Sequence, residues 1–181
     1  MSLLGHVAIG VVAGRGVTDV RGDGEALVGR LVGFSALALL PDSDLILGAF
    51  MPGVALFEHR GPSHSLVVAA VVAIVAAFIL TAAGQSHPGR WAGLVFLVVA
   101  SHGLIDTLGQ SDLGVQLLWP FSDARILAPW HILPNPALEH PLERAFVTPL
   151  VAEVLLYLPA WLYAFTPRSW IAGLRGRLAA R

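Results

Sequence analysis

An uncharged apolar run over residues 65–83 is the feature that most limits how this chain can fold. As an α-helix, such a run is long enough to cross a hydrocarbon layer of about 30 Å. The rest of the composition agrees, because 56% of the residues are hydrophobic and 13% are charged, against about 25% charged residues in an ordinary soluble domain. A lipid bilayer is therefore the solvent that this chain favours.

Other apolar segments predict further helices. Residues 91–108 and 145–165 are long enough to span a bilayer. Residues 3–13 and 27–40 are shorter, and the second of them is expected to end at Pro41, so they predict tilted spans, half-helices or a packed pair. The expected fold is all-α, a polytopic integral membrane bundle of about four to five apolar helices.

Residues 110–144 interrupt the helical pattern. Prolines, which cannot continue a helix, alternate here with tryptophan and phenylalanine, which suit the headgroup zone of a bilayer. We expect a proline-rich interfacial loop. No polar linker divides the chain, so residues 1–167, this loop included, are expected to form a single membrane-embedded domain, followed by a basic tail over residues 168–181.

The basic residues indicate an orientation. If all five apolar segments cross, one side of the membrane holds Arg15, Arg21, Arg30, Arg90, Arg168, Arg175, Arg177 and Arg181, and the other holds Arg60, Arg125 and Arg144. The positive-inside rule makes the arginine-rich side cytoplasmic. The net charge of −1 argues against a basic nucleic-acid surface, so no nucleic-acid partner is expected.

Histidine and aspartate recur in pairs at the ends of the apolar segments. The pairs are Asp42 with Asp44, His59 with His64, and His102 with Asp106, and His6 lies near the start of the chain. An ionisable side chain in an apolar segment is costly unless it faces protein or a cavity. The alternation of segments places all of these residues on the non-cytoplasmic side, so we expect them to form one site.

These residue types predict a metal site. Histidine and aspartate donors without cysteine suit zinc first, with manganese or ferrous iron as alternatives, and the set is large enough for one or two ions. Such ions activate a water for hydrolysis. Each pair also has a simpler interpretation: a hydrogen-bonded helical pair for His102 and Asp106, helix caps for Asp42 and Asp44, or interfacial histidines.

The same residues resemble a family, the membrane-bound metal-dependent hydrolases of the YdjM type from prokaryotic inner membranes. The resemblance rests on short blocks in one order, Gly5-His6, Leu40 to Asp44, His59 to Leu66, His102 to Asp106, Leu118 to Pro120 and Leu142 to Arg144, of which the block from His59 is the most specific. The family is distantly similar to zinc-dependent phospholipase C and single-strand nucleases. That similarity implies the metal ligands His6, Asp42, His64, His102 and Asp106.

We therefore expect a membrane-bound hydrolase that uses a metal-activated water to cleave a phosphoester of a lipid or another amphiphile. Asp44 and His59 are expected to bind metal or to orient its ligands. Arg60 is expected to hold an anionic substrate oxygen, and Glu143 or Glu139 to carry a proton. Two alternatives remain open: a metal or proton transport protein that uses the same cluster, and a structural membrane protein stapled by a metal.

Overall fold

The computed structural model describes residues 3–17, 24–111, 113–133, 144–167 and 170. The α-helices are α1 (Leu3–Gly16), α2 (Gly24–Leu39), α3 (Ser43–Phe50), α4 (Leu66–Ala82), α5 (Pro88–Asp106), α6 (Arg144–Leu156) and α7 (Leu158–Phe165), and the short 3-10 turns are η1 (Leu40–Asp42), η2 (Ala55–Phe57) and η3 (Pro62–His64). The described residues contain isolated β-bridges but no strand. The all-α prediction is confirmed.

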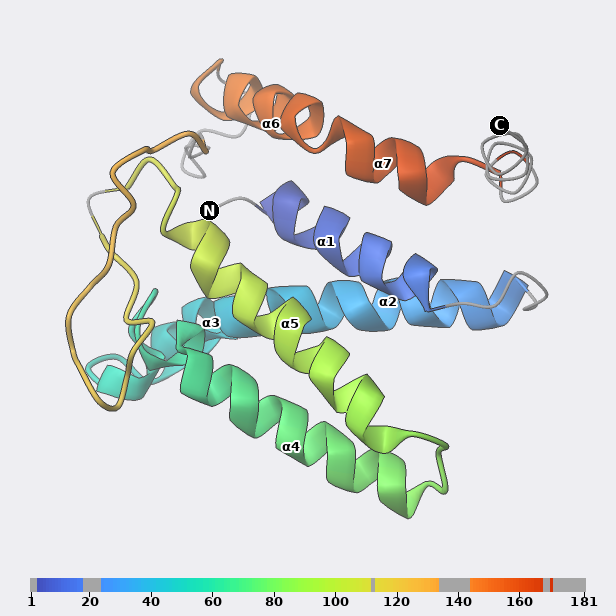
Figure 1. Ribbon diagram of the computed structural model, residues 1–181. Coiled ribbons are helices and arrows are strands. Elements are labelled where there is room, and N and C mark those ends of the chain that lie inside the picture. The colour runs from blue at the N-terminus through green and yellow to red at the C-terminus, as the bar shows by residue number, and fades with distance from the viewer. Residues whose placement is uncertain (1–2, 18–23, 112, 134–143, 168–169, 171–181) are drawn as a thin grey trace.

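The helices are arranged so that alternate helix ends gather at two ends of the molecule. In Figure 1, α1 and α2 run antiparallel, α4 and α5 form a second antiparallel pair, α5 crosses α2, and α6 with α7 lie over α1. The start of α1, the end of α2, the start of α4 and the end of α5 therefore share one end, which we call the loop end because residues 107–133 lie there. We call the opposite end the arginine end, after Arg30 and Arg90.

The α1 and α2 pair packs through glycine. A Cβ atom at Gly10 would lie 2.5 Å from the Cα of Ser35, and one at Gly14 would lie 2.6 Å from the carbonyl oxygen of Arg30. Two glycines separated by three residues let helix backbones approach closely, which replaces the hydrophobic driving force that helices lack inside lipid. Gly10 and Gly14 thus set the distance between the two helices.

Small residues also join α4 to α5. Ala69 and Ala73 are buried against Val95 and Val99, while the opposite face of α4 is open, with the Phe78 side chain 73% exposed. A helix that buries a narrow stripe of alanine and exposes large apolar side chains suits contact with lipid on its outer face.

Within the part of the chain that the structure describes, two helical stretches are long and apolar enough to cross a membrane, Glu25–Phe50 and Pro88–Asp106. Val147–Leu156 and Leu158–Phe165, bent by 65°, make a third if they act as one span. The second segment ends as an α-helix at Leu39, close to the expected end at Pro41, but its helical stretch continues through η1 and α3. Proline occupies the first turn of η1, where its missing N–H leaves no helical hydrogen bond unmade, and the chain continues helically to Phe50. The segment over 65–83 forms α4, which at 17 residues is shorter than either stretch.

Two buried charges join α1 to the α6 and α7 pair. The backbone N–H of Leu4 donates to Glu153 Oε2 at 3.2 Å, and the Arg15 guanidinium donates to the carbonyls of Ala164 and Thr166. These partners are the unsatisfied backbone groups at a helix start and a helix end, which favour negative and positive charge respectively. Glu153 and Arg15 therefore stabilise the packing of α1 on α6 and α7 through hydrogen bonds to helix ends.

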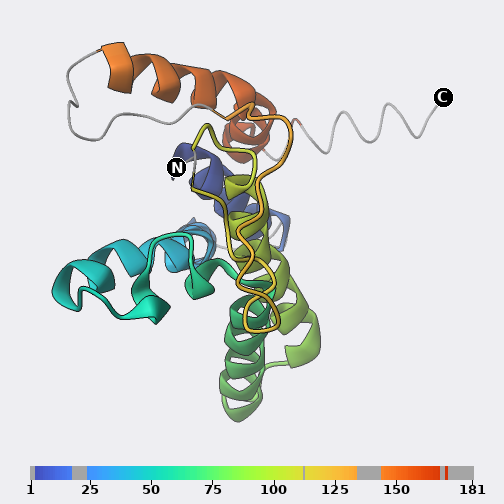
Figure 2. The same cartoon turned by 90° about the vertical axis from the view of Figure 1, so that its left-hand side faces the viewer.

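Residues 107–133 fold back over the loop end (Figure 2). The two halves pair between Val115 and Ile126, and the backbone N–H of Leu66 donates to the carbonyl of Leu117 at 3.0 Å. Val115, Leu117 and Leu133 are buried. Most of the predicted proline-rich loop is thus packed on the helices. Its interfacial position and the division between residues 1–167 and the tail stay predictions, since residues 134–143 and all of the tail but Trp170 lie outside the described residues.

Labelling of single cysteines can test the orientation, because the chain contains no cysteine of its own. Phe121 lies in the loop and is 86% exposed, and Ala179 lies in the predicted tail. We expect a membrane-impermeant maleimide, applied to intact cells, to label Phe121→Cys and not Ala179→Cys, because the positive-inside rule places the tail in the cytoplasm. Labelling of both variants from outside would mean that the bent α6 and α7 pair does not cross the membrane.

Candidate metal centre

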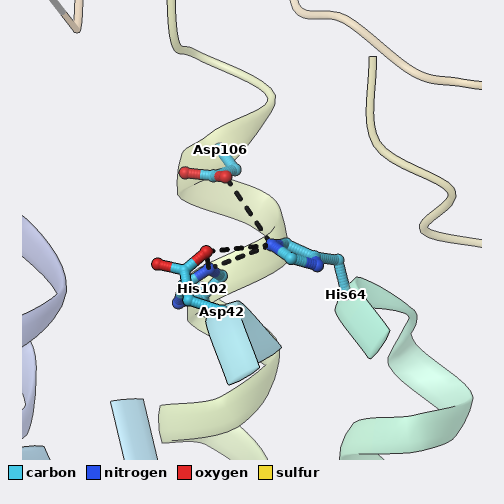
Figure 3. Close-up of side chains that lie close together, drawn as sticks. All are labelled: Asp42, His64, His102 and Asp106. Atoms are coloured by element: carbon cyan, nitrogen blue, oxygen red, sulfur yellow. Dashed lines mark hydrogen bonds and ion pairs between the residues drawn. The ribbon is translucent and has the colours of Figure 1, made fainter. Parts of the chain in front are cut away.

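Four ionisable side chains from three separate segments meet at the loop end (Figure 3). Asp42 ends η1, His64 ends η3, and His102 and Asp106 lie one turn apart on α5. One nitrogen or oxygen atom from each of the four lies within 4.8 Å of the others. His64, His102 and Asp106 are buried, and the Asp42 side chain is 9% exposed. The alternation of segments therefore brings together residues from all three predicted pairs.

Gly103 allows this meeting. A Cβ atom at Gly103 would lie 2.3 Å from the carbonyl oxygen of His64, far closer than any real contact. Only glycine lets the η3 backbone rest directly on α5 at this point, between His102 and Asp106 in sequence. The position of His64 beside His102 depends on that contact.

The distances between the four donors fit the edges of a metal polyhedron. Bonds of about 2.0–2.1 Å in a tetrahedral zinc site place neighbouring donors about 3.3 Å apart. His64 Nε2 lies 3.1 Å from His102 Nε2. Asp42 Oδ1 lies 3.4 Å from His102 Nε2 and 3.6 Å from His64 Nε2, and Asp106 Oδ2 lies 3.7 Å from His64 Nε2. These residues fit a divalent ion with imidazole and carboxylate ligands.

Contacts behind the two histidines turn their Nε2 atoms toward the centre. His102 Nδ1 lies 2.7 Å from the carbonyl oxygen of Ala38, which can only accept, so Nδ1 carries a proton and, in the neutral ring, Nε2 keeps its lone pair. His64 Nδ1 faces Ser63 Oγ at 2.9 Å and Asp44 Oδ2 at 3.3 Å. Partners of this kind fix the tautomer and orientation of metal-binding histidines.

The charge of the cluster also calls for a cation. Asp42, Asp44 and Asp106 bring three carboxylates, and Arg60, with Nε 3.3 Å from Asp106 Oδ2, brings one guanidinium. With neutral histidines, two negative charges remain unbalanced in an apolar setting, which is costly without a partner. Neither carboxylate oxygen of Asp42 has a hydrogen-bond donor among the described residues. A divalent cation would balance this charge.

Without a metal, a proton on His64 balances part of the negative charge of the cluster. Burial by itself lowers the pKa of His64, but its contacts with Asp42 and Asp44 outweigh burial and raise that pKa to about 9. The cluster therefore holds a positive charge at His64 when no metal is bound.

His6 and Arg60 both contact Asp106. His6 Nε2 lies 3.1 Å from Asp106 Oδ1, and its ring stacks on His102 with centroids 3.7 Å apart. His6 is outside the group of four close donors, so its part as a ligand stays a prediction. The buried Arg60, whose φ is 60°, donates from Nη1 to the carbonyl of Leu113 at 2.9 Å. In this position Arg60 orients Asp106, and contact with a substrate oxygen stays a prediction.

Asp44 and His59 lie behind His64 and form a second group of possible ligands with it. His59 Nδ1 lies 3.1 Å from Asp44 Oδ1. The side chain of His59 is 24% exposed, while that of Asp44 is fully buried. Both residues line an open cavity of about 290 Å³ beside α3. This cavity gives the loop end an opening next to the metal site.

Some contributors to the site escape sequence reasoning. Ser63 donates to Asp44 Oδ2 at 2.8 Å and has no predicted role, although it lies in the most specific sequence block. The carbonyls of Ala38 and Leu113 act through the backbone, so no residue type marks them. Glu139 and Glu143, the predicted proton carriers, lie outside the described residues.

A methyl group at Gly103 should disturb the site without removing a ligand. We expect Gly103→Ala to lower both thermal stability and metal content, because its Cβ would overlap the His64 carbonyl and overpacking costs about 1–3 kcal/mol. Gly89→Ala on the same helix is the control, since a Cβ there meets nothing within 4 Å. Equal melting temperatures and metal content for the two variants would contradict the close approach.

Metal content can be measured directly on the purified protein. We expect one to two equivalents of a divalent ion by elemental analysis, and a loss of metal in His64→Ala and in Asp106→Ala, because each removes one of four donors. His131→Ala is the control, since His131 is exposed and belongs to neither group of possible ligands. Retained metal in both cluster variants would refute the site.

Comparisons with known proteins place the chain in a family. Inner membrane protein YbcI of Escherichia coli (strain K12) is 44% identical over 108 residues, which cover 54% of this chain and 57% of that relative. The chain thus spans little more than half the length of this relative. No solved structure matches. A model of the YdjM inner membrane protein family matches residues 1–172, and with the family expected from the sequence blocks thereby confirmed, the chain belongs to that family of inner membrane proteins.

Proposed function

We propose that this protein is a metal-dependent hydrolase of the membrane, and that its substrate is a phosphoester of a lipid or another amphiphile. The observation that carries the proposal is the group of Asp42, His64, His102 and Asp106, whose donor atoms lie within 4.8 Å of one another. An ion held there would act as a Lewis acid and lower the pKa of a bound water.

The number of protein donors bears on this chemistry. Four donors complete a tetrahedron, as in structural zinc sites, whereas catalysis needs an open position. Manganese or ferrous iron, which accept more ligands than four, would leave such a position with the same donors, and so would zinc in a five-coordinate state. The donor set therefore also supports a second candidate, a metal that only staples η1, η3 and α5 together.

The cavity beside α3 supports an amphiphilic substrate. Its apolar wall includes Leu45, Met51 and Phe57, and its polar wall is formed by Asp44, Glu58 and His59. An acyl chain suits the first wall. Because the second wall carries two carboxylates, a phosphoester would need the positive charge of the bound metal ion to approach it. His59 contacts both this cavity and Asp44, so it is placed to exchange a proton with a substrate as a general acid or base.

A transport function has less support. A proton or metal path requires ionisable groups at several depths of the membrane. Glu153 and Arg15 are buried and belong to neither group of possible metal ligands, and both contact backbone groups at helix ends. Their charge is thus explained by the packing of α1 on α6 and α7.

Hydrolysis can be assayed on purified protein in detergent, with a phospholipid in mixed micelles and with a soluble aryl phosphodiester. We expect activity that EDTA removes and added zinc, manganese or ferrous iron restores. His102→Ala should abolish it on both substrates, because it removes a donor. Asp44→Asn should lower it by about 10–100-fold, the usual effect of losing a group that orients a metal ligand.

A change in the apolar wall of the cavity can test the preference for a phospholipid over a soluble ester. Phe57→Ala should weaken turnover of the phospholipid more than that of the soluble ester, because it removes part of the apolar wall. Phe121→Ala, in the exposed loop and outside the cavity lining, is the control for this route. A metal-replete protein that hydrolyses neither phosphoesters nor acyl esters would refute the hydrolase and favour the structural staple.

A further inference from the structure

A second, larger cavity lies at the arginine end. It has a volume of about 920 Å³ and lies between the end of α1, the middle of α2, the turn that joins α4 to α5, and the first half of α5. Arg90 on its wall and Asp106 at the metal centre are about 24 Å apart along α5, at 1.5 Å per residue. The cavity is therefore separate from the proposed hydrolytic site, and a ligand bound in it would not depend on hydrolysis at the loop end.

One wall of this cavity is cationic. Arg30 and Arg90 line it together with His87, and no carboxylate is found among the described residues that do so. The guanidinium of Arg30 is held in place, because its Nη1 donates to the carbonyl of Val17 at 3.0 Å and its Cζ lies 5.8 Å from the centre of the Trp91 ring. The cavity thus presents positive charge at a defined place.

The other wall is apolar. Trp91, Leu94, Phe96 and Leu97 line it along α5, and Leu97 is 63% exposed on the helix surface. Trp91 is itself held by stacking on Phe34, with ring centroids 6.4 Å apart. The positive charge therefore lies at the start of α5, and the apolar surface extends from it toward the middle of the helix.

We propose that this cavity binds the phosphate headgroup of an anionic phospholipid, from the leaflet at the arginine end. Guanidinium groups match the oxygens of a phosphate, and basic pockets between membrane helices on the cytoplasmic side bind anionic headgroups. Free phosphate shares the headgroup's chemistry. The lipid is the better occupant because the apolar wall of Leu94 and Leu97 suits an acyl chain, which free phosphate lacks.

Native mass spectrometry of the purified full chain tests this proposal. The protein is titrated with phosphatidylglycerol, phosphatidylcholine or inorganic phosphate, and bound adducts are counted. We expect selective retention of phosphatidylglycerol. The double variant Arg30→Gln with Arg90→Gln should weaken that binding about 30-fold, at about 1 kcal/mol for each arginine near a membrane surface. Arg125→Gln, which removes one arginine at the loop end and so matches the single variant Arg90→Gln, should leave it unchanged.

Two further measurements keep the result interpretable. The single variant Arg90→Gln changes an exposed side chain and should weaken lipid binding by a smaller factor than the double variant does. An unchanged metal content in every variant would show that the fold is intact. Equal retention of the two lipids, or equal binding by the double variant and Arg125→Gln, would overturn the proposal. Binding of inorganic phosphate with no preference for phosphatidylglycerol would also overturn it and assign the cavity to free phosphate.

Discussion

Burial of negative charge at the loop end is the constraint on which the rest of this structure depends. Asp44 and Asp106 are almost fully buried, and Asp42 nearly so. Carboxylates are stable in such a place only with paired cations and hydrogen-bond donors. The chain brings Arg60 and several histidines against them from separate segments, and residues 107–111 and 113–133 pack over the same end of the helices.

Close backbone contact makes this arrangement possible. Inside lipid, helices gain little from burying apolar side chains against one another, so small residues decide how near they come. Gly10 and Gly14 bring α1 against α2, and Gly103 brings η3 against α5. The same property that packs the bundle thus also sets the distance between His64 and His102, and the metal site is part of the packing.

The two ends of the helices differ in chemistry because charge is distributed unequally between them. The loop end gathers carboxylates and imidazoles around a place for a cation, whereas the arginine end presents guanidinium groups around a cavity. Glu153 and Arg15, buried between α1 and the α6 and α7 pair, contact backbone groups at helix ends and hold these helices together. The place for a cation and the guanidinium groups that suit an anion therefore lie at opposite ends of the helices, while other buried charges only stabilise the packing.

The sequence by itself determined the helical class, because the length of an apolar run is a local property, and it determined the family through its short blocks. It also placed His102 and Asp106 on one helix face, because a spacing of four residues acts locally. Alternation of segments then placed the His and Asp pairs at one end. Only the tertiary structure decided that the chain continues past Pro41, that Arg60 faces Asp106, and that His6 lies beside the four closest donors. The tautomer of His102 is set by the carbonyl of Ala38, a contact between residues 64 positions apart. Backbone carbonyls are present at every residue, so no sequence pattern marks the one that a histidine will reach.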